Sequence, residues 1–201
     1  MWPFQVPGNT VSVRAASPAD ARPRVVPLLV NILSFQAGWF ASVLGAARGS
    51  SWLGPAVLVP LVVFHLARAV DRRTEALFLA VSGVAGLLAE TAMIAAGFYL
   101  PAASPFPAPL APPWLVAMWV NFGTTLSVSL RFLERRPVLA ALLGAAAGPL
   151  AYLAGEGLGA IRFPDPRWPG IMALAVLWGA AVPGLFLLRG RLSHSPLRPN
   201  R

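Results

Sequence analysis

The sequence ALFLAVSGVAGLLAETAMIAAGFYL, residues 76–100, contains a single acidic or basic side chain, that of Glu90. About 20 mainly apolar residues are enough for a helix to cross the hydrocarbon core of a membrane, which is roughly 30 Å thick. The stretch therefore predicts a transmembrane helix. A carboxyl group in such a helix is costly unless it faces the protein interior, so Glu90 is a candidate functional residue.

The rest of the chain has the same character. Of its 201 residues, 57% are hydrophobic and 11% are charged, whereas soluble domains contain about 25% charged residues. Apolar runs between charged or proline-rich breaks predict an all-α fold, a polytopic integral membrane bundle of six transmembrane helices. The predicted spans are residues 25–47, 52–69, 75–99, 113–133, 137–155 and 169–188.

The arginines predict the orientation of this bundle, because cytoplasmic connections retain an excess of positive charge. One side would carry Arg14, Arg22, Arg24, Arg68, Arg72, Arg73, Arg131, Arg135, Arg136, Arg189, Arg191, Arg198 and Arg201, and the other only Arg48, Arg162 and Arg167. Both termini are therefore expected in the cytoplasm. Residues 1–24 would be a flexible basic leader, residues 25–190 the transmembrane domain and residues 191–201 a basic cytoplasmic tail.

Charge and composition also bear on the class of function. The formal net charge is +9, but a nucleic-acid site needs a basic face with interleaved polar and aromatic groups. Here the arginines lie at the ends of apolar runs instead, so no nucleic-acid partner is expected. The absence of lysine and the abundance of alanine, proline and glycine are typical of a GC-rich bacterial genome. We therefore expect a multi-pass protein of the bacterial cytoplasmic (inner) membrane.

Familiar catalytic signatures are missing from the sequence. It has no glycine-rich phosphate loop, no G-x-S-x-G elbow and no histidine pair at metal-ligand spacing. It contains no cysteine, which excludes disulfides and thiolate metal sites. We expect neither a metal nor a cofactor, and the sequence leans against an enzyme without deciding the question.

The helical spacing around Glu90 predicts which way its side chain points. Gly83, Gly86 and Gly97 fall on the same face as Glu90 at about 100° per residue. Membrane helices meet through small residues, so this face would be turned into the bundle. Two interpretations stay open at this point, a functional carboxyl group and a hydrogen-bonded carboxyl group that only fixes helix packing.

Depth selects among the polar side chains that Glu90 could meet. His65 lies near the cytoplasmic end of its span, so at 1.5 Å per residue it would differ from Glu90 by roughly 15 Å in depth. Direct contact between them is not expected. Asn121, with Thr125 beside it on the same face, lies at a more suitable depth. An amide satisfies either protonation state of a carboxyl group, so Asn121 is the predicted partner.

Other polar residues complete the candidate site. The predicted pocket or proton site consists of Glu90, Asn121, Thr125, Tyr152 and Asp165, and the secondary candidates are Asn31, Gln36, His65 and Glu156.

Three segments resemble a known family. They are NILSFQAGWFASVLGAARGSSWLGP, FGTTLSVSLRFL and LLGAAAGPLAYLAGEGLGAIRFP, and they contain a Phe-Gln-x-x-Trp-Phe run and a Gly-Pro-Leu-x-Tyr-x-x-Gly run. Over residues 28–190 the chain resembles an uncharacterised family of bacterial inner-membrane proteins, domain of unknown function 2878. The resemblance implies an Asn-His pair where this chain has Ser127 and Val128, and it hints at lipid chemistry.

These observations support three hypotheses. The leading one is a six-span membrane protein that binds or moves a lipid-like or small amphipathic molecule through an outward-facing polar pocket, capped by the loop that holds Asp165. The first alternative is a membrane-embedded enzyme that modifies lipid acyl chains, with Glu90 or His65 as acid or base. The second alternative is a non-catalytic scaffold or assembly subunit. The expected partners are membrane lipids and a lipid-like ligand, with a membrane-protein partner or a homo-oligomer under the scaffold hypothesis.

Overall fold

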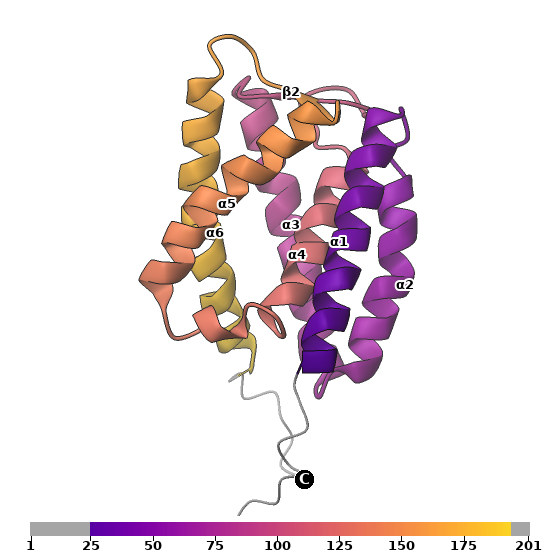
Figure 1. The fold of residues 1–201 in the computed structure, drawn as a ribbon, viewed down its shortest axis with the longest axis vertical. Coiled ribbons are helices and arrows are strands. Elements are labelled where there is room, and N and C mark those ends of the chain that lie inside the picture. The colour runs from indigo at the N-terminus through magenta and orange to yellow at the C-terminus, as the bar shows by residue number, and fades with distance from the viewer. Residues whose placement is uncertain (1–24, 194–201) are drawn as a thin grey trace, which may run out of the picture.

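The computed structural model describes residues 25–193, so the predictions for the leader and for residues 194–201, with their five arginines, lie outside it. Within this part the chain forms six α-helices with short connecting elements (Figure 1). The elements are α1 (Val25–Ala47), α2 (Leu53–Arg68), α3 (Arg72–Ala95), β1 (Leu100–Pro101), α4 (Pro113–Leu126), the 3-10 helix η2 (Arg131–Leu133), α5 (Pro137–Gly157), β2 (Ile161–Arg162) and α6 (Trp168–Ser193). The predicted all-helical fold is confirmed.

The helices differ in length. Four in the described part, α1, α3, α5 and α6, are long and apolar enough to cross a membrane, which indicates a membrane protein. Helix α2 has 16 residues and α4 has 14. At 1.5 Å per residue α4 is about 21 Å long, less than the hydrocarbon thickness of roughly 30 Å. That all six helices cross the membrane stays a prediction.

The fourth predicted span is not one continuous helix. Helix α4 ends at Leu126, and a turn over residues 127–130 leads into η2. Asn31 of α1 explains the break, because its Nδ2 donates to the Thr124 carbonyl (3.1 Å) and its Oδ1 accepts from Ser129 N (3.3 Å) and Ser129 Oγ (2.7 Å). A continued helix would use the Thr124 carbonyl and the Ser129 amide for its own i→i−4 bonds. One polar side chain therefore replaces two helical hydrogen bonds.

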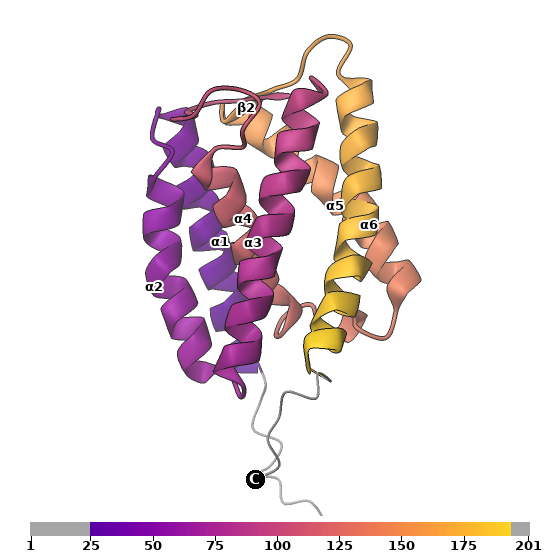
Figure 2. The same cartoon turned by 180° about the vertical axis from the view of Figure 1, so that it is seen from behind.

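The helices form two groups. Helix α4 packs against α1, α2 and α3, and most of its side chains are buried. Helices α5 and α6 form an antiparallel pair that meets the first four helices chiefly where α6 lies beside α3, as the view from behind shows (Figure 2). Buried apolar side chains form two core clusters, one with Tyr99 and Trp114 and the other with Phe78 and Leu126. The contact between α3 and α6 thus joins two groups that are otherwise loosely connected.

Two glycines allow the close helix contacts around Glu90. A Cβ atom at Gly86 of α3 would lie 2.2 Å from Cγ of Trp119, and one at Gly148 of α5 would lie 2.4 Å from Cγ of Trp178. Such distances are far below van der Waals contact, so only glycine fits at either position. Gly83 and Gly86 of α3 are turned into the bundle, as the spacing predicts, and Gly86 receives a tryptophan ring. Gly97 lies beyond the end of α3 and is exposed.

A short strand pair fixes the end of the molecule opposite the described termini. Strand β1 pairs with β2 in antiparallel register, Leu100 opposite Arg162 and Pro101 opposite Ile161. The pair ties the α3–α4 connection to the α5–α6 connection (Figure 1). Tyr99, directly before β1, is thereby held beside α5.

Candidate functional site

Glu90 is the centre of a closed hydrogen-bonded cluster. Its side chain is 0% exposed. Oε1 accepts a hydrogen bond from Trp119 Nε1 (2.7 Å) on α4 and another from the Tyr152 hydroxyl on α5, and the Tyr99 hydroxyl contacts Oε2. Both tyrosines of the chain therefore meet this one carboxyl group. Three donors satisfy a polar group that would otherwise be costly to bury.

The chemistry of the donors restricts where a proton can lie. An indole N–H can only donate, so Trp119 fixes Oε1 as an acceptor in either protonation state of Glu90. A proton on Oε2, on the side of Tyr99, leaves Oε1 as a carbonyl oxygen, which is the better acceptor for its two donors. Trp119 is held in place by stacking on Trp178 of α6, with ring centroids 4.8 Å apart. The cluster is therefore an ordered unit that joins α3, α4, α5 and α6.

An apolar cavity lies against this cluster. It has a volume of about 530 Å³, and its wall is formed by α1, α4, α5 and α6, with Leu130, Leu133 and Ile161 from the connections. We call it the lateral cavity. Aliphatic and aromatic side chains form most of its wall, and Gln36 and Tyr152 are its polar residues. Because Glu90 does not line the cavity itself, Tyr152 is the link between the buried carboxyl group and the open space.

One donor in the cavity wall is unused. Trp178 Nε1 is buried and has no hydrogen-bond partner among the described residues, although the Tyr152 hydroxyl is a close neighbour. A buried N–H group without an acceptor costs about 1–3 kcal/mol. The lateral cavity thus has Tyr152 and Trp178 side by side in its wall, and the buried indole N–H of Trp178 has the Tyr152 hydroxyl as its polar neighbour.

The predicted pairing of Glu90 with Asn121 is wrong. Asn121 Nδ2 donates to the Phe35 carbonyl of α1 (2.9 Å), and Trp119 takes the place next to Glu90 instead. Asn121 and Trp119 are two residues apart, about 200° on a helix, so they face opposite directions. The Thr125 hydroxyl donates to the Phe122 carbonyl of its own helix (2.6 Å). Neither residue belongs to the Glu90 cluster.

The remaining candidates are dispersed. Gln36 lies in the lateral cavity wall, whereas Asp165 is exposed in the α5–α6 connection and does not line that cavity. Glu156 accepts a hydrogen bond from Phe163 N (2.9 Å), and its Oε2 lies 3.7 Å from Arg167 Nη1. The predicted cap over the pocket by the Asp165 loop is therefore not found at the lateral cavity.

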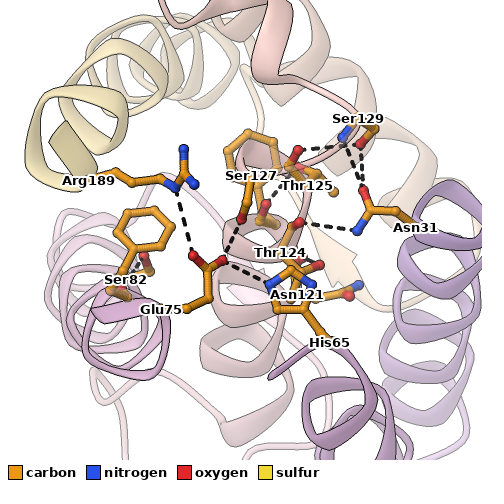
Figure 3. Close-up of polar contacts among 12 residues, drawn as sticks. Asn31, His65, Glu75, Ser82, Asn121, Thr124, Thr125, Ser127, Ser129 and Arg189 are labelled. Carbon is orange, nitrogen blue, oxygen red and sulfur yellow. Dashed lines mark hydrogen bonds and ion pairs between the residues drawn. The ribbon is translucent and has the colours of Figure 1, made fainter. Parts of the chain in front are cut away.

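His65 lies away from Glu90, as its depth predicts. It belongs to a second polar cluster, around Glu75, which was not among the predicted sites. His65 Nε2 lies 2.8 Å from Oε1 of Glu75, which also contacts the Ser127 hydroxyl, while Arg189 Nε lies 3.8 Å from Glu75 Oε2 (Figure 3). Asn31 and Ser129 bind each other beside this cluster (Figure 3). A signal for Glu75 existed, since it follows the same helical stripe as Gly86 and Glu90.

Within residues 25–193, no group of three or more histidine, aspartate or glutamate side chains lies close enough to hold a metal ion.

Comparison with known proteins identifies the family. The family model described as "Protein of unknown function (DUF2878)" matches residues 28–184. The chain belongs to this family. No curated protein and no solved structure matches it. In this DUF2878 protein, the Phe-Gln-x-x-Trp-Phe run contributes Gln36 and Trp39 to the lateral cavity, and the Gly-Pro-Leu-x-Tyr-x-x-Gly run contributes Gly148 and Tyr152. The two runs thus face the same cavity from α1 and α5.

Proposed function

We propose that this DUF2878 protein is an integral protein of the bacterial cytoplasmic membrane that binds a lipid-like or small amphipathic molecule in the lateral cavity. The observation that carries the proposal is the unpaired Trp178 N–H beside Tyr152 in an otherwise apolar wall. An apolar chain fits such a wall, and a hydroxyl or carbonyl oxygen of the ligand would accept from Trp178. The volume of about 530 Å³ lies within the usual range of ligand pockets, roughly 300–1,000 Å³.

The distribution of arginines supports a membrane orientation with all six helices crossing. The end where α1 begins and α6 ends carries Arg68, Arg72, Arg73, Arg131, Arg135, Arg136, Arg189 and Arg191, and the opposite end carries Arg48, Arg162 and Arg167. By the positive-inside rule the first end would be cytoplasmic. The short helix α4 can cross in this arrangement because the other helices shield it from lipid, and irregular backbone at membrane depth is tolerated inside protein.

The ligand-binding groups differ from those expected from sequence. The sequence predicts a polar, outward-facing pocket around Glu90 and Asn121. The proposed site is instead an apolar cavity with one polar corner, formed by Trp178 and Tyr152. Glu90 would act through Tyr152, since it accepts from the Tyr152 hydroxyl and so fixes its orientation. We therefore assign Tyr152 and Trp178 the contact with ligand and Glu90 a positioning role.

Native mass spectrometry of gently extracted full-length protein tests the proposal. Ala147 lies in the cavity wall and is exposed, so Ala147→Trp would fill space without displacing packed atoms. Ala146 is also exposed but does not line the cavity, which makes Ala146→Trp a matched control. We expect a reproducible co-purifying lipid on the wild type and on the control, and its loss from Ala147→Trp. Equal retention by both variants, or a stoichiometric protein partner in place of a lipid, would contradict the proposal.

Acid–base chemistry on an acyl chain is the second candidate function. It is favoured by the position of the Glu90 carboxyl group, which accepts a hydrogen bond from Tyr152 of the cavity wall. Lipid profiling of a deletion strain complemented with wild type or with Glu90→Gln would test it. An altered acyl-chain composition that Glu90→Gln fails to restore supports chemistry, while full restoration by Glu90→Gln excludes an acid–base role for this residue.

A further inference from the structure

A second cavity opens at the arginine-rich end of the molecule. It has a volume of about 530 Å³ and lies among α1, α2, α3, the turn over residues 127–130 and the end of α6. We call it the vestibule. It touches α4 at Asn121 and Thr124, whereas the lateral cavity touches α4 at Met118 and Phe122. The vestibule is therefore a separate site with a polar lining.

The carboxylates in the vestibule wall are already engaged by protein donors. Oε1 of Glu75 receives His65 Nε2 at 2.8 Å and the Ser127 hydroxyl. Asp71 caps α3 by accepting from Thr74 N (3.2 Å) and from Thr74 Oγ1 (2.9 Å). These carboxylate oxygens, which could otherwise bind a cation, are thus largely occupied by donors of the protein itself.

The arginines in the same wall, in contrast, have few close hydrogen-bond acceptors. Arg189 Nε is buried and donates no hydrogen bond to any described residue, while the guanidinium group forms two long ion pairs, in which oxygens of Glu75 and Glu134 lie 3.8 Å from its nitrogens. Arg68 is exposed, and among residues 25–193 its one recorded contact is the Phe64 ring, 5.1 Å from its Cζ. Arg68 therefore has no acidic partner among the described residues, and Arg189 is held only by long ion pairs.

The charges of the lining residues also favour an anionic ligand. The charged residues lining the vestibule are Arg68, Arg131 and Arg189 against Asp71 and Glu75. A guanidinium group presents several N–H donors in a planar fork that matches the oxygens of a phosphate group. Glu134, which does not line the vestibule, pairs with Arg131 and Arg189, so Arg68 is the lining arginine without an ion-pair partner among the described residues. A ligand with several anionic oxygens would bind Arg68 and bring closer acceptors to Arg189.

We propose that the vestibule binds a phosphate-bearing molecule, with its anionic oxygens on the Arg68 and Arg189 guanidinium groups. The phosphate belongs either to a lipid headgroup at the membrane surface or to a soluble phosphate compound. The site does not depend on occupancy of the lateral cavity, because it uses other residues on another face of α4.

Binding of two probes to the purified full-length protein in a zwitterionic detergent tests the assignment. Inorganic phosphate, titrated by calorimetry, represents the soluble source. Phosphatidylglycerol represents the lipid source and is compared with phosphatidylcholine of the same chain length by native mass spectrometry. We expect saturable binding of inorganic phosphate, or selective retention of phosphatidylglycerol, and the probe that binds identifies the source. Failure of both probes would overturn the proposal.

Three variants locate the binding. Arg68→Gln, whose side chain has few contacts to lose, should weaken binding about tenfold or more, the usual value of a lost charged hydrogen bond. Arg189→Lys keeps the charge but loses the fork, and it should weaken binding as well. Arg191→Gln removes the same charge from an exposed position on the same helix that does not line the vestibule, so its affinity should stay within about twofold of wild type. An equal loss in Arg68→Gln and Arg191→Gln would overturn the site.

Discussion

Helix α3 carries two buried carboxyl groups whose surroundings differ in kind. Glu90 is fully enclosed and contacts two phenols and an indole, which are neutral donors. Glu75, about 22 Å along the same helix, is 8% exposed and meets a histidine, a serine and an arginine at the edge of the vestibule. The comparison teaches that one helix can use the same residue type in two ways. Glu90 holds Tyr152 in place in the wall of the apolar lateral cavity. Glu75 neutralises part of the arginine charge in the polar vestibule.

The largest effect is expected from removing the enclosed carboxyl group. Glu90→Ala leaves the Trp119 N–H and two hydroxyls buried without their acceptor, so the free energy of unfolding should fall by about 3 kcal/mol or more. Unfolding in mixed lipid–detergent micelles measures it. The control is Glu134→Ala, since the Glu134 side chain is 40% exposed and its removal should cost less than about 1 kcal/mol. Equal stability of the two variants would show that the Glu90 cluster is not structural.

Intermediate effects on stability and on lipid binding are expected from the two tyrosines that bind Glu90, and they should differ between the two. Tyr152→Phe and Tyr99→Phe each remove one hydrogen bond to the same carboxyl group, so each should lower the free energy of unfolding by about 1 kcal/mol. Tyr152 lines the lateral cavity and Tyr99 does not. Retention of the co-purifying lipid should therefore fall about tenfold in Tyr152→Phe alone. A similar loss of lipid in Tyr99→Phe would mean that the whole cluster, and not the Tyr152 hydroxyl, determines binding.

The smallest effect on stability is expected at Glu75. Glu75→Gln keeps an oxygen that can accept from His65 and Ser127, and Arg189 keeps Glu134 as an ion-pair partner, so the free energy of unfolding should fall by only about 0.5–1 kcal/mol. The negative charge beside Arg189 is removed, so the affinity of the vestibule for inorganic phosphate should rise. Calorimetry on the variant measures both the sign and the size of this change. Weaker phosphate binding would contradict the division of roles between the two carboxyl groups.

Much of the fold could be predicted from the sequence, because it follows from local patterns. The apolar runs and their charged breaks predict six helices. The position of glycines around Glu90 predicts that its side chain points inward, since small residues mark the faces where membrane helices meet. The depth of His65 predicts its separation from Glu90. Each of these predictions depends only on residues within one helix or on the length of a span.

The partners of the polar groups could not be predicted in the same way. Asn121 and Trp119 lie two residues apart, and only the rotation of α4 against α3 decides which of them meets Glu90. Tyr99 reaches the site because β1 pairs with β2, a contact between connections far apart in the sequence. The end of α4 at Leu126 depends on Asn31 of another helix. Such contacts are set by tertiary packing, for which a single sequence gives no local signal.

The central claim is that the lateral cavity binds a lipid-like molecule at the polar corner formed by Trp178 and Tyr152. Electron cryomicroscopy of the full-length protein, purified with native lipids into nanodiscs and bound to an antibody fragment, tests it most directly. The account predicts elongated density along the apolar wall, with a polar end within hydrogen-bond distance of Trp178 Nε1 and the Tyr152 hydroxyl. A lateral cavity closed by the protein's own side chains, or density whose polar end lies away from Trp178, would contradict it.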